Sequence, residues 1–178
     1  MAGPGGIGDS STFSIVDAAI WDALKEQDST AGTELSDWRR EQRVGAGKGK
    51  DFSVKEVPDL DKIKDTDTPA LIAVNGGALS QGTAGADFEE LVYTRRILGV
   101  VRGGSDETTQ DQKCKKFGEL CWNLLAHHRQ NCFGDFITGT NPIKKMDIVH
   151  LVFPEILQPV EVFMFDLGLE FQIEITNR

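Results

Sequence analysis

The sequence lacks the features by which disulfide-rich, zinc-binding and membrane proteins are usually recognised. It has only three cysteines, an odd number without any Cys-x-x-Cys pair, which argues against a disulfide framework and a zinc knuckle and fits a reducing cytosol. No run of about eighteen apolar residues occurs, and the first residues form neither a charged n-region nor an apolar h-region. We therefore expect a folded protein without a membrane span or a signal peptide.

Basic residues are too few to balance the acidic ones. The chain holds 28 Asp and Glu against 19 Lys and Arg, a formal net charge of −9. Such a surface repels the phosphates of nucleic acids, so we do not expect sequence-specific DNA binding. The length of 178 residues fits one domain over residues 1–178, in which residues 1–12 form a mobile leader.

Two segments have the periodicity of amphipathic helices. Over residues 14–26 the apolar side chains fall on one helical face, and Ser14 with Asp17 resembles a capping box at the start. Phe13, directly before this cap, could pack onto the first turn. Over residues 108–129, the apolar side chains share one face with Cys114 and Cys121, while lysines take the other. We expect both segments to be helices.

Five segments have the pattern of strands. They are residues 70–74, 90–101, 135–140, 145–153 and 161–175. In the last one, the odd positions are almost all apolar and the even positions from Asp166 onward are polar or glycine, which predicts one buried and one wet face. The order of elements predicts an α+β fold: a mixed, mainly antiparallel sheet of about five strands, with two amphipathic helices on one face.

Residues 27–69 show no persistent periodicity and predict a long irregular arm. Leu35, Trp38 and Val44 could support one helical turn within it. Compact domains seldom carry so long an irregular segment unless it is functional or becomes ordered against a partner. A second irregular segment, a glycine-rich loop, is expected between residue 75 and Asp87.

Glycine-rich segments and histidines do not form a recognisable cofactor or metal site. Neither Lys48 nor Lys50 is followed by Ser or Thr, as a Walker A loop requires. His127 and His128 are adjacent and point in different directions on a helix, and the third histidine, His150, lies on a predicted strand. We therefore expect no cofactor and no metal.

Catalysis by a cysteine is the main alternative from another functional class. Cys132 or Cys121 could meet His127 or His150 in space and act as the nucleophile of a small cytosolic hydrolase. The helical periodicity instead places Cys114 and Cys121 among small core residues. Our interpretation is that the protein is not an enzyme, with the hydrolase kept as an alternative.

Four segments together suggest a family. They are TPALIAV, LVYTRRILGVVRGG, QDQKCKKFGELCWNLLAHHRQ and VEVFMFDLGLEFQIEITNR. With the N-terminal helix they cover nearly the whole chain, and their order resembles the tail terminator proteins of tailed bacteriophages; related tail-completion and neck proteins share this layout. The resemblance implies an α+β subunit of a ring, typically a hexamer, at the head-proximal end of the tail tube.

The resemblance also implies a role and partners. Such a ring stops tube polymerisation and docks the head or neck connector. It contacts the tail tube protein, the neck protein and, in some tails, the sheath, and DNA passes through it without specific binding. The protein would then be part of the virion, assembled in the host cytoplasm, and would not contact a membrane.

Two groups of residues are candidates for contacts in such a ring. Arginine suits subunit interfaces because it pairs with carboxylates through two hydrogen bonds, although a solvated strand face is an equal alternative. Glu170 and Glu174, on the predicted wet face, would line the channel and keep a DNA duplex from adhering. The candidate interface residues are Trp38, Arg39, Arg40, Arg95, Arg96 and Arg102.

A third hypothesis for the function is a monomeric adaptor whose arm folds on binding.

Overall fold

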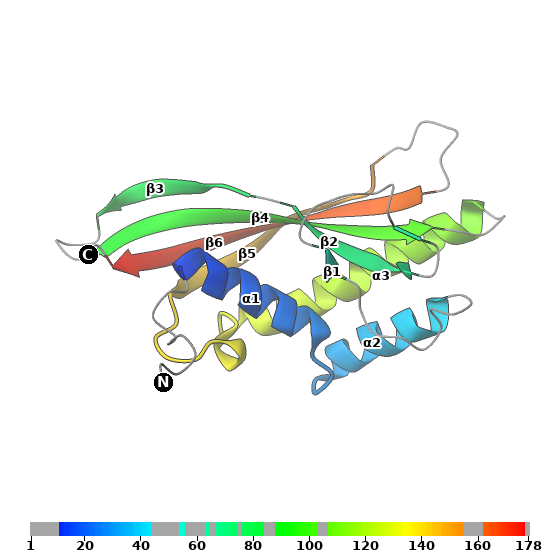
Figure 1. The fold of residues 1–178 in the computed structure, drawn as a ribbon, viewed down its shortest axis with the longest axis horizontal. Coiled ribbons are helices and arrows are strands. Elements are labelled where there is room, and N and C mark those ends of the chain that lie inside the picture. Colours follow the sequence, from blue (N-terminus) through cyan, green and yellow to red (C-terminus); the bar gives the residue numbers. More distant parts are fainter. Residues whose placement is uncertain are drawn as a thin grey trace, which may run out of the picture.

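A computed structural model shows helices gathered on one side of a sheet (Figure 1). It describes residues 11–43, 54–55, 63–64, 67–74, 76–83, 88–102, 107–154 and 162–176. Within these residues the helices are α1 (Thr12–Lys25), α2 (Thr30–Gln42) and α3 (Glu107–Arg129). The strands are β1 (Val54–Lys55), β2 (Ala70–Val74), β3 (Ala78–Thr83), β4 (Phe88–Arg102), β5 (Ile143–Val152) and β6 (Val162–Thr176). The expected α+β class is confirmed.

The antiparallel pair β4 and β6 forms the centre of the sheet. Its register runs without interruption from Phe88 opposite Thr176 to Arg102 opposite Val162. The strand order is β1-β2-β4-β6-β5, and β3 pairs with β4 on the same side as β2. Only the β1–β2 pair is parallel among the described strands, so the sheet is mixed and mainly antiparallel, as expected.

A glycine lies at the corner between β2 and β3. A Cβ atom on Gly76 would lie 1.5 Å from the backbone oxygen of Thr94, so a side chain cannot be accommodated there. Gly77 follows, and its backbone N–H and C=O both bond to the Thr94 hydroxyl. This corner lets two short strands occupy successive stretches of one edge of β4.

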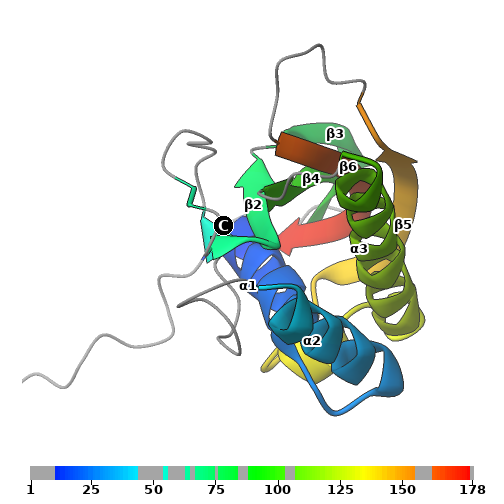
Figure 2. The same cartoon turned by 90° about the vertical axis from the view of Figure 1, so that its right-hand side faces the viewer.

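The core lies between the helices and the odd-numbered positions of β4 and β6. On β6 the odd positions from 165 to 173 are buried, and Phe163 and Ile175 at the two ends are half-buried. Phe165 meets Phe117 of α3 edge to face, with ring centroids 5.2 Å apart, and its ring fills the space above Gly99. Seen from the end of the sheet, α1 and α3 lie next to each other and α2 packs beside them (Figure 2). The fully buried residues of β6 are Phe165, Leu167, Leu169 and Phe171.

Helix α1 begins earlier than the sequence pattern indicated. Its N-cap is Ser11, whose side chain accepts a hydrogen bond from the backbone N–H of Ser14 at 3.2 Å, so the predicted capping box at Ser14 is wrong. The Asp17 carboxylate accepts a hydrogen bond from the Tyr93 hydroxyl at 3.0 Å. Thr12, placed in the predicted leader, is helical, while residues 1–10 lie outside the described part of the chain.

The first part of the predicted arm is a helix, not an irregular segment. Ser29 caps α2 by accepting from the backbone N–H of Gly32, and Trp38 stacks on Phe117 of α3 with ring centroids 5.5 Å apart. The described part of the chain therefore has three α-helices on one face of the sheet where two were expected. Of the rest of the arm, the structure describes residues 43, 54–55, 63–64 and 67–69.

Two further predictions of local structure are wrong. Residues 78–83, expected in a loop, form β3, because β4 extends beyond β2 and offers its remaining edge. Residues 135–140 were expected to be a strand, but Gly134–Phe136 form a 3-10 turn that follows two residues with positive φ, Cys132 (51°) and Phe133 (59°). No described helix combines the length and the apolar character that a bilayer crossing requires.

Candidate functional site

The face of the sheet opposite the described helices, called the open face below, presents a cluster of charged side chains. The register brings Arg96 of β4 opposite Gly168 of β6, and Gly168 in turn opposite His150 of β5. Asp166 lies between them: its carboxylate accepts from the Nε and Nη2 atoms of Arg96 and lies 3.2 Å from Nε2 of His150. Of these residues the sequence singled out only Arg96 as an interface candidate; the structure brings it together with Asp166 and His150.

Asp166 is the buried member of this cluster. Its side chain is 12% exposed, against 52% for Arg96 and 38% for His150. Burial alone would raise the pKa of Asp166, but the hydrogen bonds from Arg96 and His150 outweigh it and lower this pKa. The same contact raises the pKa of Arg96. Arg96 and Asp166 are therefore both ionised at neutral pH, and their charges offset each other.

The acidic residues predicted to line a channel lie on this same open face. Glu170 and Glu174 are partly exposed on β6. Lys144 of β5 lies 3.3 Å from Glu174, and Lys145 pairs with Asp147. The described residues of this face carry both signs of charge, so its repulsion of DNA would be weaker than the sequence suggested.

Arg102 lies at the other, apolar end of the open face. There Ile72 and Val100 are buried with Ile63, and Leu98, Val162 and Met164 pack around them. The Nη1 atom of Arg102 donates to the backbone oxygen of Ile63 at 2.8 Å. Arg102 therefore attaches residue 63 to the sheet, so this contact lies within the subunit and not between subunits.

Arg95 belongs to the opposite face. As an odd-numbered residue of β4 it points to α1, where its Nε lies 2.8 Å from Asp17, and its side chain is only 13% exposed. Tyr93 shares the same carboxylate; burial and the charge of Asp17 raise the pKa of Tyr93 to about 12. Arg95 and Arg96 thus point to opposite faces, as the two-residue period of a strand requires.

The candidate residues of the predicted arm are turned inward on α2. Trp38 is half-buried against Phe117, and Arg39 is 3% exposed. Arg40 donates to the side-chain oxygen of Gln27 at 3.3 Å. In this conformation, Arg39 in particular is not accessible to another chain.

The edges of the sheet carry exposed apolar side chains that sequence reasoning missed. β5 pairs only with β6 among the described strands, and β3 pairs only with β4. Val149 and Val152 of β5 are 52% and 50% exposed, and Leu79 of β3 is 71% exposed. Val149 sits at an irregularity in the β5 register, which the alternation of residue types did not reveal.

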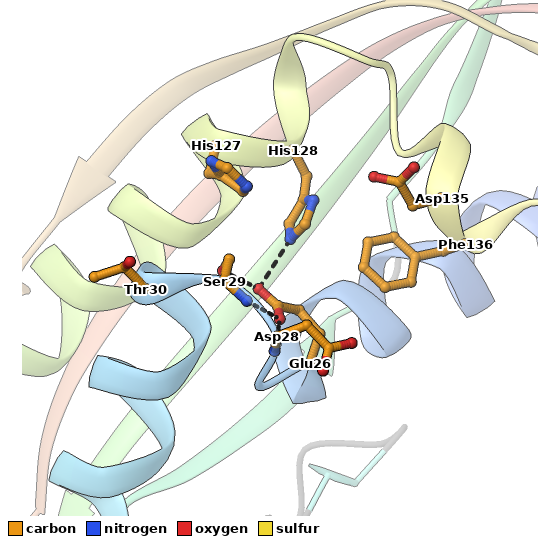
Figure 3. Close-up of a pocket in the computed structure, with 8 residues that line it drawn as sticks. All are labelled: Glu26, Asp28, Ser29, Thr30, His127, His128, Asp135 and Phe136. Carbon is orange, nitrogen blue, oxygen red and sulfur yellow. Dashed lines mark hydrogen bonds and ion pairs between the residues drawn. The ribbon is translucent and has the colours of Figure 1, made fainter.

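A cleft of about 620 Å³ lies between the corner joining α1 to α2 and the end of α3. Figure 3 shows Glu26 and His128 at its base, with Asp135 and Phe136 on the far side. Nε2 of His128 lies 3.2 Å from Oε1 of Glu26, and both side chains are more than nine-tenths buried. The lining residues are Glu26, Asp28, Ser29, Thr30, His127, His128, Asp135 and Phe136.

The carboxylate of Glu26 makes four polar contacts with three residues. Its carboxylate accepts from the backbone N–H groups of Asp28 and Ser29, from the Ser29 hydroxyl, and makes the contact with His128. Burial would raise the pKa of Glu26, but these hydrogen bonds together lower it below the ordinary value. The carboxylate thus joins the start of α2 to the end of α3.

The cysteines do not have the environment of an activated nucleophile. Cys121 is fully buried, and burial raises the pKa of its thiol; burial likewise raises the pKa of Cys114 to about 12. Cys132 is half-buried, and its Sγ contacts the backbone oxygen of Lys144 at 3.6 Å. The histidine that is buried beside a carboxylate is His128, which the hydrolase hypothesis did not include.

The described residues do not form a metal-binding site. No group of three or more His, Cys, Asp or Glu side chains is arranged there to hold an ion. Two surfaces thus stand out: the open sheet face with its apolar edges, and the cleft at Glu26 and His128.

Comparison of the sequence with protein-family models and with curated proteins finds no match.

Proposed function

We propose that the protein is a structural subunit that associates with further copies of itself through the edges of its sheet. The observation that carries this proposal is the exposure of Val149 and Val152 on β5 and of Leu79 on β3. An edge strand offers unpaired backbone N–H and C=O groups, and apolar side chains beside them favour pairing with another chain.

The two edges differ, and this difference favours a ring. β5 ends one side of the sheet, while β3 lies on the other side of the β4–β6 pair. When unlike surfaces of identical copies meet, the contact is head to tail, and repetition gives either a closed ring or an open filament. The resemblance to phage tail terminators, which form rings, favours closure. In such a ring, Arg96, Glu170 and Glu174 would lie on a face shared by all copies.

The proposed role follows from the resemblance. The ring would cap the head-proximal end of a tail tube, stop its polymerisation and dock the head connector, as part of a virion. Passing DNA would meet the open face without specific binding, in keeping with the net charge of −9.

Native mass spectrometry over a range of protein concentrations tests the assembly. We expect one discrete oligomer, with six copies if the terminator role holds. The double variant Val149→Lys/Val152→Lys should shift the population to monomers, because charges on an edge strand oppose pairing. Asn123→Lys, at an exposed position of α3, is the matched control and should keep the oligomer. A monomer at every concentration would contradict the proposal.

A polymerisation assay tests the terminator role separately. Tail tube subunits encoded in the same genome should form long tubes alone and shorter, capped tubes when the protein is added. Electron micrographs would show a ring at one tube end only. Tubes of unchanged length in the presence of a proven oligomer would exclude the terminator role while leaving the assembly intact.

A further inference from the structure

The cleft at Glu26 and His128 presents hydrogen-bond acceptors. Nε2 of His128 is directed at the Glu26 carboxylate, which holds the hydrogen on that nitrogen in the neutral ring. The other ring nitrogen, Nδ1, then keeps a lone pair and can only accept. Figure 3 shows this second nitrogen on the side of the ring that faces Asp135 and Phe136. In this tautomer, a ligand group that contacts Nδ1 donates to it.

The charges around the cleft also favour a ligand that donates hydrogen bonds, and in particular a cation. Asp28 and Asp135 line it beside Glu26, and none of the described residues that line it is Lys or Arg. Asp135 already accepts from the side-chain amide of Asn131 at 2.6 Å, which fixes the orientation of its carboxylate. The three carboxylates of this lining would repel an anionic ligand.

Aromatic surface completes the wall. Phe136 is half-buried and meets His128 edge to face, with ring centroids 4.8 Å apart. The face of such a ring attracts an organic cation, and a guanidinium can also stack on it. The Ser29 hydroxyl is already occupied, because it donates to Glu26 and accepts from the N–H of Gly32.

From these observations we infer that the cleft is a binding site for an organic cation, an alkylammonium or guanidinium group. Asp28 and Asp135 supply the charge, Nδ1 of His128 accepts one hydrogen bond, and Phe136 supplies the apolar wall. The group can belong to a small free amine or to a lysine or arginine side chain of a second copy. The inference does not depend on the proposed assembly.

NMR spectroscopy of the ¹⁵N-labelled full chain tests this site. Methylguanidinium is the probe, and sodium acetate at equal ionic strength is the anionic control. We expect saturable shifts of the amides of residues 28–30 and 134–136 with the cation and none with acetate. The variant Asp28→Asn/Asp135→Asn should weaken binding roughly tenfold or more, since charge-assisted hydrogen bonds are lost.

Two controls make the outcome unambiguous. Asp22→Asn removes an exposed carboxylate of α1 outside the cleft and should leave the affinity unchanged. Raising the protein concentration without probe distinguishes the two sources: shifts of the same amides would mean that a side chain of a second copy fills the cleft. The inference is overturned if neither experiment shifts these amides, or if Asp22→Asn weakens binding as much as the double variant.

Discussion

The two faces of the sheet bury neighbouring residues of one strand by different means. Phe165 is fully buried under the helices, where Phe117 of α3 packs on it. Asp166, the next residue, has a side chain that is only 12% exposed on the opposite face, where Arg96 and His150 surround its carboxylate. Burial of an ionised group is tolerated when partners replace its hydration.

The comparison teaches that side chains on the open face are ordered although none of the described helices covers it. Around Asp166 the side chains are held by charge pairing and by the contact of His150 with Gly168, whereas the covered face depends on apolar packing. Packing is costly to disturb because a closed interior cannot rearrange, but exposed groups can move into solvent. The following predictions test this difference, beginning with the largest effect.

Truncation of Phe165 should be the most damaging single change. Phe165→Ala leaves a cavity between β6 and α3, and we expect a loss of about 3–5 kcal/mol in the free energy of unfolding. Met164→Ala, one residue earlier on the open face, is the control and should cost about 1 kcal/mol, because Met164 is only partly buried. Urea denaturation measures both. Equal losses would mean that the two faces are packed alike.

Two glycines permit the same test with a single methyl group. A Cβ on Gly99 would lie 1.9 Å from the ring of Phe165, which is enclosed, so Gly99→Ala should cost about 1–3 kcal/mol. A Cβ on Gly168 would lie 2.2 Å from the ring of His150, which can move outward. Gly168→Ala should therefore stay within about 1 kcal/mol of the wild type. Thermal unfolding ranks the two variants, and the reverse order would refute the explanation.

The buried carboxylate of Glu26 should produce a dependence of stability on pH. Because its pKa is lowered in the folded protein, its contribution is present above the ordinary value of 4.5 and is lost as pH falls through the folded pKa. Glu26→Gln should cost about 1–3 kcal/mol at neutral pH. Urea titrations at a series of pH values should show this difference shrinking below pH 4.5.

The matched control for this pH dependence is Asp22→Asn, which removes an exposed carboxylate from α1, the helix directly before Glu26. It should leave the free energy of unfolding nearly unchanged at every pH. A difference between wild type and Glu26→Gln that stays constant as pH falls would show that the carboxylate is not the titrating group.

The smallest effect is expected from the ion pair on the open face. A double-mutant cycle with Arg96→Ala and Asp166→Asn should give a coupling energy of about 0.5–1 kcal/mol, since the Arg96 side chain is 52% exposed. Added salt should reduce it. A coupling of several kcal/mol that is insensitive to salt would indicate that this face is covered in solution, as in an assembly.

The helices and strands with a regular hydrophobic pattern were predictable from the sequence, because each of them packs one apolar face into the core. In β6 the apolar odd positions are buried as the alternation predicted, and the periodicity of α3 places Phe117, Cys121 and Leu124 in the core. Helix α2 was missed because its buried residues include Ser36 and Arg39, which do not form an apolar stripe. Its position depends on the stacking of Trp38 on Phe117, a tertiary contact.

The candidate sites were less accessible to prediction for the same reason. Glu26 and His128 are separated by 102 positions, so no local spacing indicates their contact. The pairing of Arg96 with Asp166 could have been found by combining the two strand patterns, because both residues occupy even positions. The exposure of Val149 depends on an irregularity in the pairing of β5, which residue types alone do not indicate.

The hydrogen bond between Tyr93 and Asp17 provides the protein with a built-in spectroscopic reporter. Tyr93 is the single tyrosine of the chain, and it joins β4 to the first turns of α1, where Phe13 packs on its ring. Since its pKa is raised to about 12, phenolate absorbance in an alkaline titration measures the attachment of the N-terminal helix without any label.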